Sequence, residues 1–255
     1  MIKTVRHIAV AGCTFLFVGC AEPEKQAADA KEEATRPDFN VMEDVNQKKQ
    51  SFFKFLRPFV QHENARVSEE RSFLLAIQTQ LKVGQALSAD DLDEARQLGD
   101  AYNLELGGDI VTDSWLDAML VRVDRIPEEL VLSQAANESG WGTSRFAVEG
   151  NNYFGQWCYT QGCGLVPSAR GEGAKHEVAV FSDAAQSVHA YFMNVNRNRA
   201  YAELRDIRAN ERAAGQPVTG LKLAEGLHRY SERGQDYVDE IQGMIRHNKQ
   251  FWQQG

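Results

Sequence analysis

The sequence predicts a mainly α fold of the α+β class, in which a helical domain carries a small β-lobe and follows an N-terminal helical region. Apolar residues recur at helical spacing through most of residues 41–250. Residues typical of helix ends separate these segments, such as Ser88 with an acid three positions later, and Gly140. Residues 151–181 differ, because glycines, aromatics and the short alternation His-Glu-Val-Ala-Val-Phe predict turns and a small β element.

The composition is that of an ordinary globular protein with room for a proper core. The chain has 255 residues, is 43% hydrophobic and has a formal charge of −8. These values exclude a chain disordered throughout, a collagen and a multi-span membrane protein. The acidic balance argues against sequence-independent binding to nucleic acid, which needs a basic surface. It does not exclude an anionic substrate, because net charge says nothing about one groove.

Residues 1–19 read as a secretory signal. Lys3 and Arg6 precede an apolar run of twelve residues that ends at Gly19 and is too short for a confident membrane span. The segment from Phe17 to Cys20 resembles a bacterial lipoprotein processing box, which implies lipid on Cys20. With Ala21 next, the resemblance implies a cell-envelope protein at the outer membrane, facing the periplasm. The alternative is an ordinary cleaved signal with a chance cysteine.

Residues 20–40 are expected to form a flexible tether between lipid and domain, because this Ala-, Glu- and Lys-rich stretch has almost nothing to bury. Residues 41–125 are expected to form four short helices. Pro58 is expected to end the first and Gly84 the second. Ser88 begins the third, and the apolar stripe over 115–123 marks the fourth. The aromatic residues of this region are expected to be core.

The second domain is expected to span 126–250. Pro127 suits the first turn of a helix, and the acids at 128 and 129 suit its positive end. This helix should run to Gly140. Further helices are expected over 183–196, 200–208, 218–227 and from 236 onward.

Glu138 is the residue in this helix that most suggests chemistry. It shares the inward-facing stripe with Val131 and Ala135. A carboxyl on that stripe is costly unless it is paired or functional. Gly140 and Gly142, on either side of Trp141, predict a turn of the chain directly after Glu138. Desolvation there would raise the pKa of Glu138 and suit a general acid, whereas the alternative is a half-buried structural glutamate.

Three blocks then resemble a known family: AANESGWGTSRFA, NNYFGQW and VFSDAAQSVHAYFMNV, in this order. They are similar to the glucosaminidase domain of bacterial cell-wall hydrolases, glycoside hydrolase family 73, described as mannosyl-glycoprotein endo-beta-N-acetylglucosaminidase-like. The similarity covers residues 126–250 and implies a lysozyme-like fold. The upstream helices, the run RVDRIPEELVLSQAANESGWG and the loop CYTQGCG resemble Bax-like bacterial proteins more specifically.

The resemblance implies a role for several residues. Glu138 matches the general acid of the family. Glu172 and Glu177 are the candidates for a second carboxylate, with Glu172 ranked first by spacing. Tyr230 matches a tyrosine that lines the catalytic groove, although Ser-Glu-Arg follows the tyrosine here where the family commonly has Ala-Thr-Asp. The residues expected to contact sugar or form the groove wall, each with core packing as its alternative, are Trp141, Asn152, Tyr153, Phe154, Trp157, Tyr191 and Tyr237.

Cys158 and Cys163 are expected to form a disulfide, because they lie close together beside a glycine turn in an exported chain. No cofactor is expected. No metal is expected either, because the histidines are scattered and His176 with Glu177 lacks the second histidine of His-Glu-x-x-His. A nucleophilic pair of either cysteine with His176 or His189 is the alternative.

Together these features predict a lipid-anchored peptidoglycan hydrolase that cleaves the β-1,4 bond after N-acetylglucosamine. Its expected partners are the glycan strands of the wall and, through the lipid, a membrane; it is expected to be a monomer without a nucleic-acid partner. The alternatives are a lytic transglycosylase, a non-catalytic wall-binding lipoprotein and a cysteine-dependent cell-wall amidase. Because the body is acidic, its affinity for an anionic wall must come from the groove and the lipid.

Overall fold

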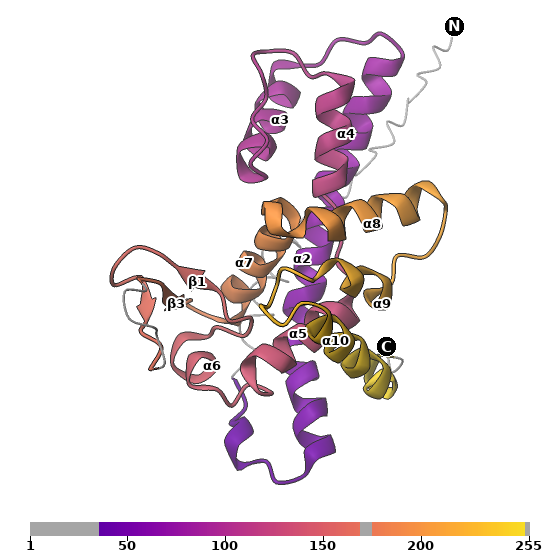
Figure 1. The fold of residues 1–255 in the computed structure, drawn as a ribbon. Helices are drawn as coiled ribbons and strands as arrows, with labels where there is room; N and C mark the ends of the chain where they lie inside the picture. The colour runs from indigo at the N-terminus through magenta and orange to yellow at the C-terminus, as the bar shows by residue number, and fades with distance from the viewer. Residues whose placement is uncertain (1–35, 169–174, 253–255) are drawn as a thin grey trace, which may run out of the picture. The chain divides into compact units, whose positions relative to one another are not determined.

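A single long helix, α2 (Val45–Lys82), organises the N-terminal half of the protein (Figure 1). The computed structural model describes residues 36–168 and 175–252. Asp44 caps α2 by accepting a hydrogen bond from the amide of Gln47 at 2.6 Å. A short 3₁₀ turn, η1 (Phe39–Val41), precedes it. The buried face of α2 continues along its length through Phe52, Leu56, Val60, Val67, Leu74 and Ile77.

The expectation that Pro58 ends a helix is wrong, because α2 passes through it without interruption. A proline here removes one backbone hydrogen bond, the one that would reach the carbonyl of Lys54. Lys54 and Pro58 lie on the exposed face of α2, so water can hydrate that carbonyl. The apolar residues on the opposite face stay buried on both sides of the proline, and their packing outweighs the lost bond.

Two shorter helices, α3 (Ala89–Ala101) and α4 (Asp113–Arg122), pack against α2. Ser88 begins α3 with a capping box, since its side chain accepts from the Asp91 amide and the Asp91 carboxylate accepts from the Ser88 amide. Thr112 caps α4 in a similar way. Within the described residues, the segment expected to hold four short helices therefore holds three helices, one of them long.

The helix that carries Glu138 is α5 (Glu128–Ser139), and it contacts α2 and several C-terminal elements. Pro127 lies at its N-cap and Gly140 ends it in the left-handed conformation at φ 55°. The remaining C-terminal elements are α7 (Ala184–Arg197), η2 (Arg199–Tyr201), α8 (Ala202–Ala213), α9 (Gly220–Leu223), η3 (Ala224–Gly226), α10 (Gln235–His247) and α11 (Lys249–Trp252). Because α2 packs against both α5 and α7, the two sides of the boundary expected at residues 125 and 126 share packing.

A small β-lobe lies between α6 (Arg145–Gly150) and α7, as expected from the alternation in this stretch. It consists of β1 (Trp157–Cys158), β2 (Gly164–Leu165) and β3 (Glu177–Ala179), in the antiparallel order β1-β3-β2. Cys158 pairs with Glu177, and Leu165 pairs with Val178. The fold is thus mainly α and lysozyme-like, with a three-stranded antiparallel sheet. Among the helices of the described residues, none is both long and apolar enough to cross a membrane.

Replacing Pro58 tests whether α2 is continuous. Pro58→Ala restores a helical N–H without leaving a cavity, because the proline is exposed. The variant should raise the free energy of unfolding by about 1–3 kcal/mol in urea denaturation. Pro217→Ala, in an exposed non-helical segment, is the control and should lower stability by no more than about 1 kcal/mol. A Pro58→Ala protein less stable than the parent would contradict the continuous helix.

Candidate active site

Glu138 lies at the end of a helix that is buried on nearly every side. The side chains of α5 from Leu130 to Ala136 are all buried, and α2, α9 and α10 cover them. Partial exposure is limited to the two ends of the helix, with Glu128 and Glu129 in the first turn and Asn137 and Glu138 in the last. The carboxyl group of Glu138 is therefore held by a rigid element at the edge of the core.

The turn after Glu138 is held by the N-terminal residues. Trp141 has a positive φ of 60°, which is unusual for a residue with a large side chain. Its ring packs edge-on against Phe52 and Phe53 at 5.8 and 5.2 Å between centroids. Arg36 donates to the carbonyl oxygen of Gly142 at 2.7 Å. These contacts fix the backbone directly after the acid.

The Phe39 ring lies so close to Gly142 that a β-carbon there would come within 2.5 Å of it, and Gly142 has a φ of +77°. Glycine is therefore required at this position by both space and conformation. Lys49 lies over the Trp141 ring at 5.1 Å, and adds a cation–π contact from α2.

A chain of buried polar groups leads to one oxygen of Glu138. The Tyr191 hydroxyl donates to Gln134 Oε1, and Gln134 Nε2 donates to the Tyr237 hydroxyl at 3.0 Å. Tyr237 in turn donates to Glu138 Oε1 at 2.8 Å. Asn137 adds a longer contact of 3.4 Å to the same oxygen. Both side-chain donors thus meet Oε1, which leaves the other oxygen, Oε2, to carry the proton when the acid is neutral.

Oε2 faces Gly155 at the start of the β-lobe. A β-carbon on Gly155 would lie 3.5 Å from Oε2, and Gly155 has a φ of +64°. Gly155 also lines a cavity with Trp157, Tyr159 and Tyr230. The proton of a neutral Glu138 is therefore placed on the side where a cavity begins.

The pKa of Glu138 is raised above its ordinary value. Burial is the largest cause, because it penalises the charged carboxylate. The hydrogen bonds from Tyr237 and Asn137 oppose this effect by stabilising the carboxylate, as does the positive charge of Arg233. The negative charge of Glu240 raises the pKa further. A raised pKa suits a group that must donate a proton near neutral pH.

The exposed aromatic residues of the site lie on the β-lobe. Trp157 is 55% exposed and stacks on His176, with ring centroids 4.0 Å apart and an angle of 13° between the planes. Tyr159 is 74% exposed and lines the same cavity. Both rings offer apolar faces of the kind that pack on sugars. Tyr230 donates to the carbonyl oxygen of Phe154 at 2.8 Å, and its ring stacks on Tyr237 at 5.3 Å.

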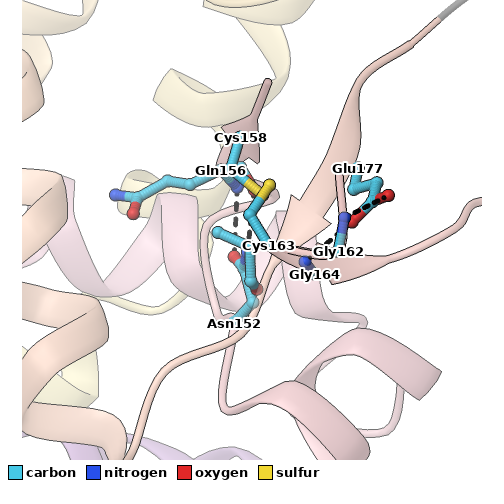
Figure 2. The surroundings of a disulfide bond; sticks show 8 residues. Asn152, Gln156, Cys158, Gly162, Cys163, Gly164 and Glu177 are labelled. Atoms are coloured by element: carbon cyan, nitrogen blue, oxygen red, sulfur yellow. Dashed lines mark hydrogen bonds between the residues drawn. A yellow bond between two sulfur atoms is a disulfide. The ribbon is translucent and has the colours of Figure 1, made fainter. Parts of the chain in front are cut away.

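Several residues expected to contact sugar lie behind this surface. Tyr153 and Tyr191 have no exposed area, and Phe154 and Tyr237 have 2% each. None of these four rings has a free face that could stack on a sugar. The expectation of direct sugar contact is therefore wrong for them, and their role is to pack behind the cavity wall. Asn152 is also buried, and its side chain donates to the carbonyl of Gln156 (Figure 2) and to that of Ala179.

Glu177 is buried in β3, where its two oxygens accept hydrogen bonds from backbone amides. Gly162 donates at 3.0 Å and Gly164 at 2.9 Å, as Figure 2 shows. These bonds order the loop between β1 and β2. Glu172, the other candidate for a second carboxylate, lies outside the described residues. Sequence reasoning missed Glu240, whose charge acts on Glu138, and Gln134, whose place in the hydrogen-bond chain only the packing shows.

The expected disulfide between Cys158 and Cys163 is present, with 6.2 Å between the Cα atoms (Figure 2). It closes the loop that carries Tyr159 beside the cavity. Within the described residues, these two sulfurs and Glu177 form the one cluster of metal-type ligands. The sulfurs are bonded to each other, so neither is a free thiolate ligand or nucleophile. Of the two histidines in the nucleophile alternative, His176 stacks on Trp157 and His189 contacts Glu63 at 3.1 Å.

A helical, lysozyme-like fold with a buried acid beside an aromatic cavity defines a glycosidase-like class of protein. Residues 119–250 match the family model described as mannosyl-glycoprotein endo-beta-N-acetylglucosaminidase, and the chain belongs to this glucosaminidase family. It is also similar to "Protein bax" of Escherichia coli strain K12, with 30% identity over 228 residues, which cover 89% of this chain and 80% of that protein. No solved structure matches the chain.

Two substitutions should move the pH profile in opposite directions. A general acid acts only when protonated, so activity falls as the pH rises through its pKa. Tyr237→Phe removes a hydrogen bond that stabilises the carboxylate, which raises the pKa of Glu138 and moves the basic limb to higher pH. Glu240→Gln removes a repelling charge, which lowers that pKa and moves the limb to lower pH.

The measurement is kcat/KM against pH on purified peptidoglycan. Glu225→Gln, whose partner is the exposed Lys222, is the control and should leave the limb in place. Shifts of the same sign in both variants would contradict the assignment of this limb to Glu138.

Proposed function

We propose that this protein is a peptidoglycan hydrolase, an N-acetylglucosaminidase that cleaves the β-1,4 bond after N-acetylglucosamine with Glu138 as general acid. The observation that carries the proposal is the asymmetric setting of Glu138. Burial raises its pKa, two donors occupy Oε1, and Oε2 faces the side where the cavity begins. Membership of the glucosaminidase family supports a glycan substrate.

The proton moves from Oε2 to the glycosidic oxygen as the bond to the sugar carbon breaks. Glu138 then carries a negative charge, and the hydrogen bonds from Tyr237 and Asn137 stabilise it. The hydrogen-bond chain through Gln134 and Tyr191 fixes the Tyr237 hydroxyl in the donating orientation. Trp157 and Tyr159 hold the sugar ring by stacking. Water attacks the sugar carbon and loses a proton to the solvent, and Glu138 takes up a proton again before the next cycle.

A lytic transglycosylase is the second candidate, and one observation favours it. Glu177 is buried and each of its oxygens accepts a backbone hydrogen bond, which is the setting of a structural carboxylate and not of one that activates water. A transglycosylase uses a single acid and needs no water at the sugar carbon. Mass spectrometry separates the two, because a hydrolase yields reducing ends and a transglycosylase yields anhydro ends.

We also propose that the protein is held in the cell envelope by lipid on Cys20, at the outer membrane facing the periplasm. The support is the sequence of residues 1–21, which lie outside the described structure. Metabolic labelling with a fatty acid tests this proposal. Wild type should carry the label, and Cys20→Ser should lose it.

Glu138→Gln tests the catalytic role directly. The variant keeps the shape of the side chain but has no acidic proton, so release of reducing ends from peptidoglycan should fall by more than about 100-fold. Glu149→Gln, an exposed glutamate on α6 paired with Arg145, is the matched control and should retain activity. Activity retained by a folded Glu138→Gln protein would contradict the assignment of Glu138 as general acid and would favour another residue in that role.

A further inference from the structure

The cavity beside Glu138 carries a positive charge that nothing in the described structure neutralises. It runs from Gly155 and Trp157 on the β-lobe to α7 and Tyr230, and its lining includes Arg229 but no carboxylate. A second cavity shares Ala190, Asn194 and Asn198 with the first. The two therefore form one continuous surface along α7.

The second cavity adds two more arginines, Arg197 and Arg199, and again no carboxylate. All three arginines are exposed. Arg197 donates to the carbonyl oxygen of Ala101 at 2.9 Å, and has no acidic partner. Arg199 and Arg229 form no hydrogen bond or ion pair through their side chains with any described residue.

Many arginines elsewhere in the protein are paired with acids. Arginines along α2 pair with acids, as Arg57 does with Glu128 and Arg66 with Glu63. Arg212 is paired with the buried Asp124. With a net charge of −8, the chain has carboxylates in excess. Arg125 and Arg246 are also exposed without an acidic partner among the described residues, so the arginines along α7 are distinguished by their grouping: they line two adjoining cavities whose lining contains no carboxylate.

From this arrangement we infer that the surface along α7 binds carboxylates carried by the glycan, so that the protein selects acidic wall glycan over a neutral chain of N-acetylglucosamine. This inference rests on the proposed function. The guanidinium group presents a planar fork of N–H donors that matches a carboxylate. Sugars of the bacterial wall carry a lactyl ether whose carboxyl group is either free, as a carboxylate, or joined by an amide bond to a peptide that has carboxylates of its own.

The position of the arginines explains how selection couples to cleavage. Arg229 precedes Tyr230, whose ring stacks on Tyr237, the donor to Glu138. Gly155 lies in the same cavity and faces Oε2. A glycan bound at Glu138 and extended along α7 therefore brings its substituents past Arg229 first and then past Arg197 and Arg199.

The test compares three glycans in the uncleaving Glu138→Gln background and in the wild type. The first is peptide-bearing peptidoglycan fragments. The second is the same fragments after amidase treatment, which removes the peptide and frees the lactyl carboxylate, and the third is a neutral chito-oligosaccharide. The Glu138→Gln protein should bind the acidic glycans more tightly, and high ionic strength should reduce the preference. A preference lost on amidase treatment assigns the contact to carboxylates of the peptide, and a retained one shows that a lactyl carboxylate is sufficient.

Charge removal then locates the contact. Each of Arg197→Gln, Arg199→Gln and Arg229→Gln should lower the ratio of acidic to neutral affinity by about threefold, and the triple variant by more than tenfold, as roughly expected for partly exposed ion pairs. Arg125→Gln is the matched control, because Arg125 is exposed and lines a different cavity beside Glu128 and Glu129. It makes the same change in net charge and should leave the ratio unchanged.

Failure of the inference and failure of the proposed function are distinguishable. Equal binding of acidic and neutral glycans, or a triple variant with an unchanged ratio, overturns the inference even if the wild type cleaves peptidoglycan. A wild type that cleaves none of the three glycans overturns the proposed function, and the binding ratios still decide whether the arginines select acidic glycan.

Discussion

The burial of α5 on nearly every side is the constraint from which the site follows. Large polar side chains on the buried part of a helix need hydrogen-bond partners. Gln134 has such partners in Tyr191 and Tyr237, and Glu138 has one in Tyr237. The same burial raises the pKa of Glu138. One packing arrangement therefore produces both the acidity of the carboxyl group and the orientation of its proton.

The N-terminal region supports this arrangement, although the family model begins only at residue 119. Helix α2 covers α5, and its phenylalanines pack on Trp141. Phe39 and Arg36 contact Gly142 from residues that precede α2. The region before the matched domain is thus part of the structure that holds the acid in place. Loss of these contacts would release a turn whose backbone is unusual at Trp141.

Local signals in the sequence predicted much of the fold. The capping box at Ser88 and the left-handed glycine at 140 depend on neighbouring residues, and both are present as expected. Glu138 could be found from its motif and its place in a turn rich in glycine. Pro58 was misjudged because the packing of the opposite face of α2 decides its effect, and no local pattern reports that packing.

Contacts between side chains from distant parts of the sequence could not be predicted for the same reason. The sequence predicts that Tyr191 and Tyr237 contact sugar or form the groove wall, with core packing as the alternative, and the fold buries both beside Gln134. The sequence shows the positions of the aromatic residues, but it does not show whether each ring faces the cavity or the core. Arg197, Arg199 and Arg229 likewise come from separate segments, and only the continuity of the two cavities along α7 brings them together.

A direct titration of Glu138 tests the central claim most sharply. Carboxyl carbons of glutamate labelled with ¹³C report protonation by their chemical shift, and the Glu138→Gln protein identifies the resonance. Burial on α5 predicts a pKa above that of the exposed glutamates in the same spectrum. A pKa at or below theirs would contradict the account, because the hydrogen bonds from Tyr237 and Asn137 would then outweigh burial and leave Glu138 without a proton to donate.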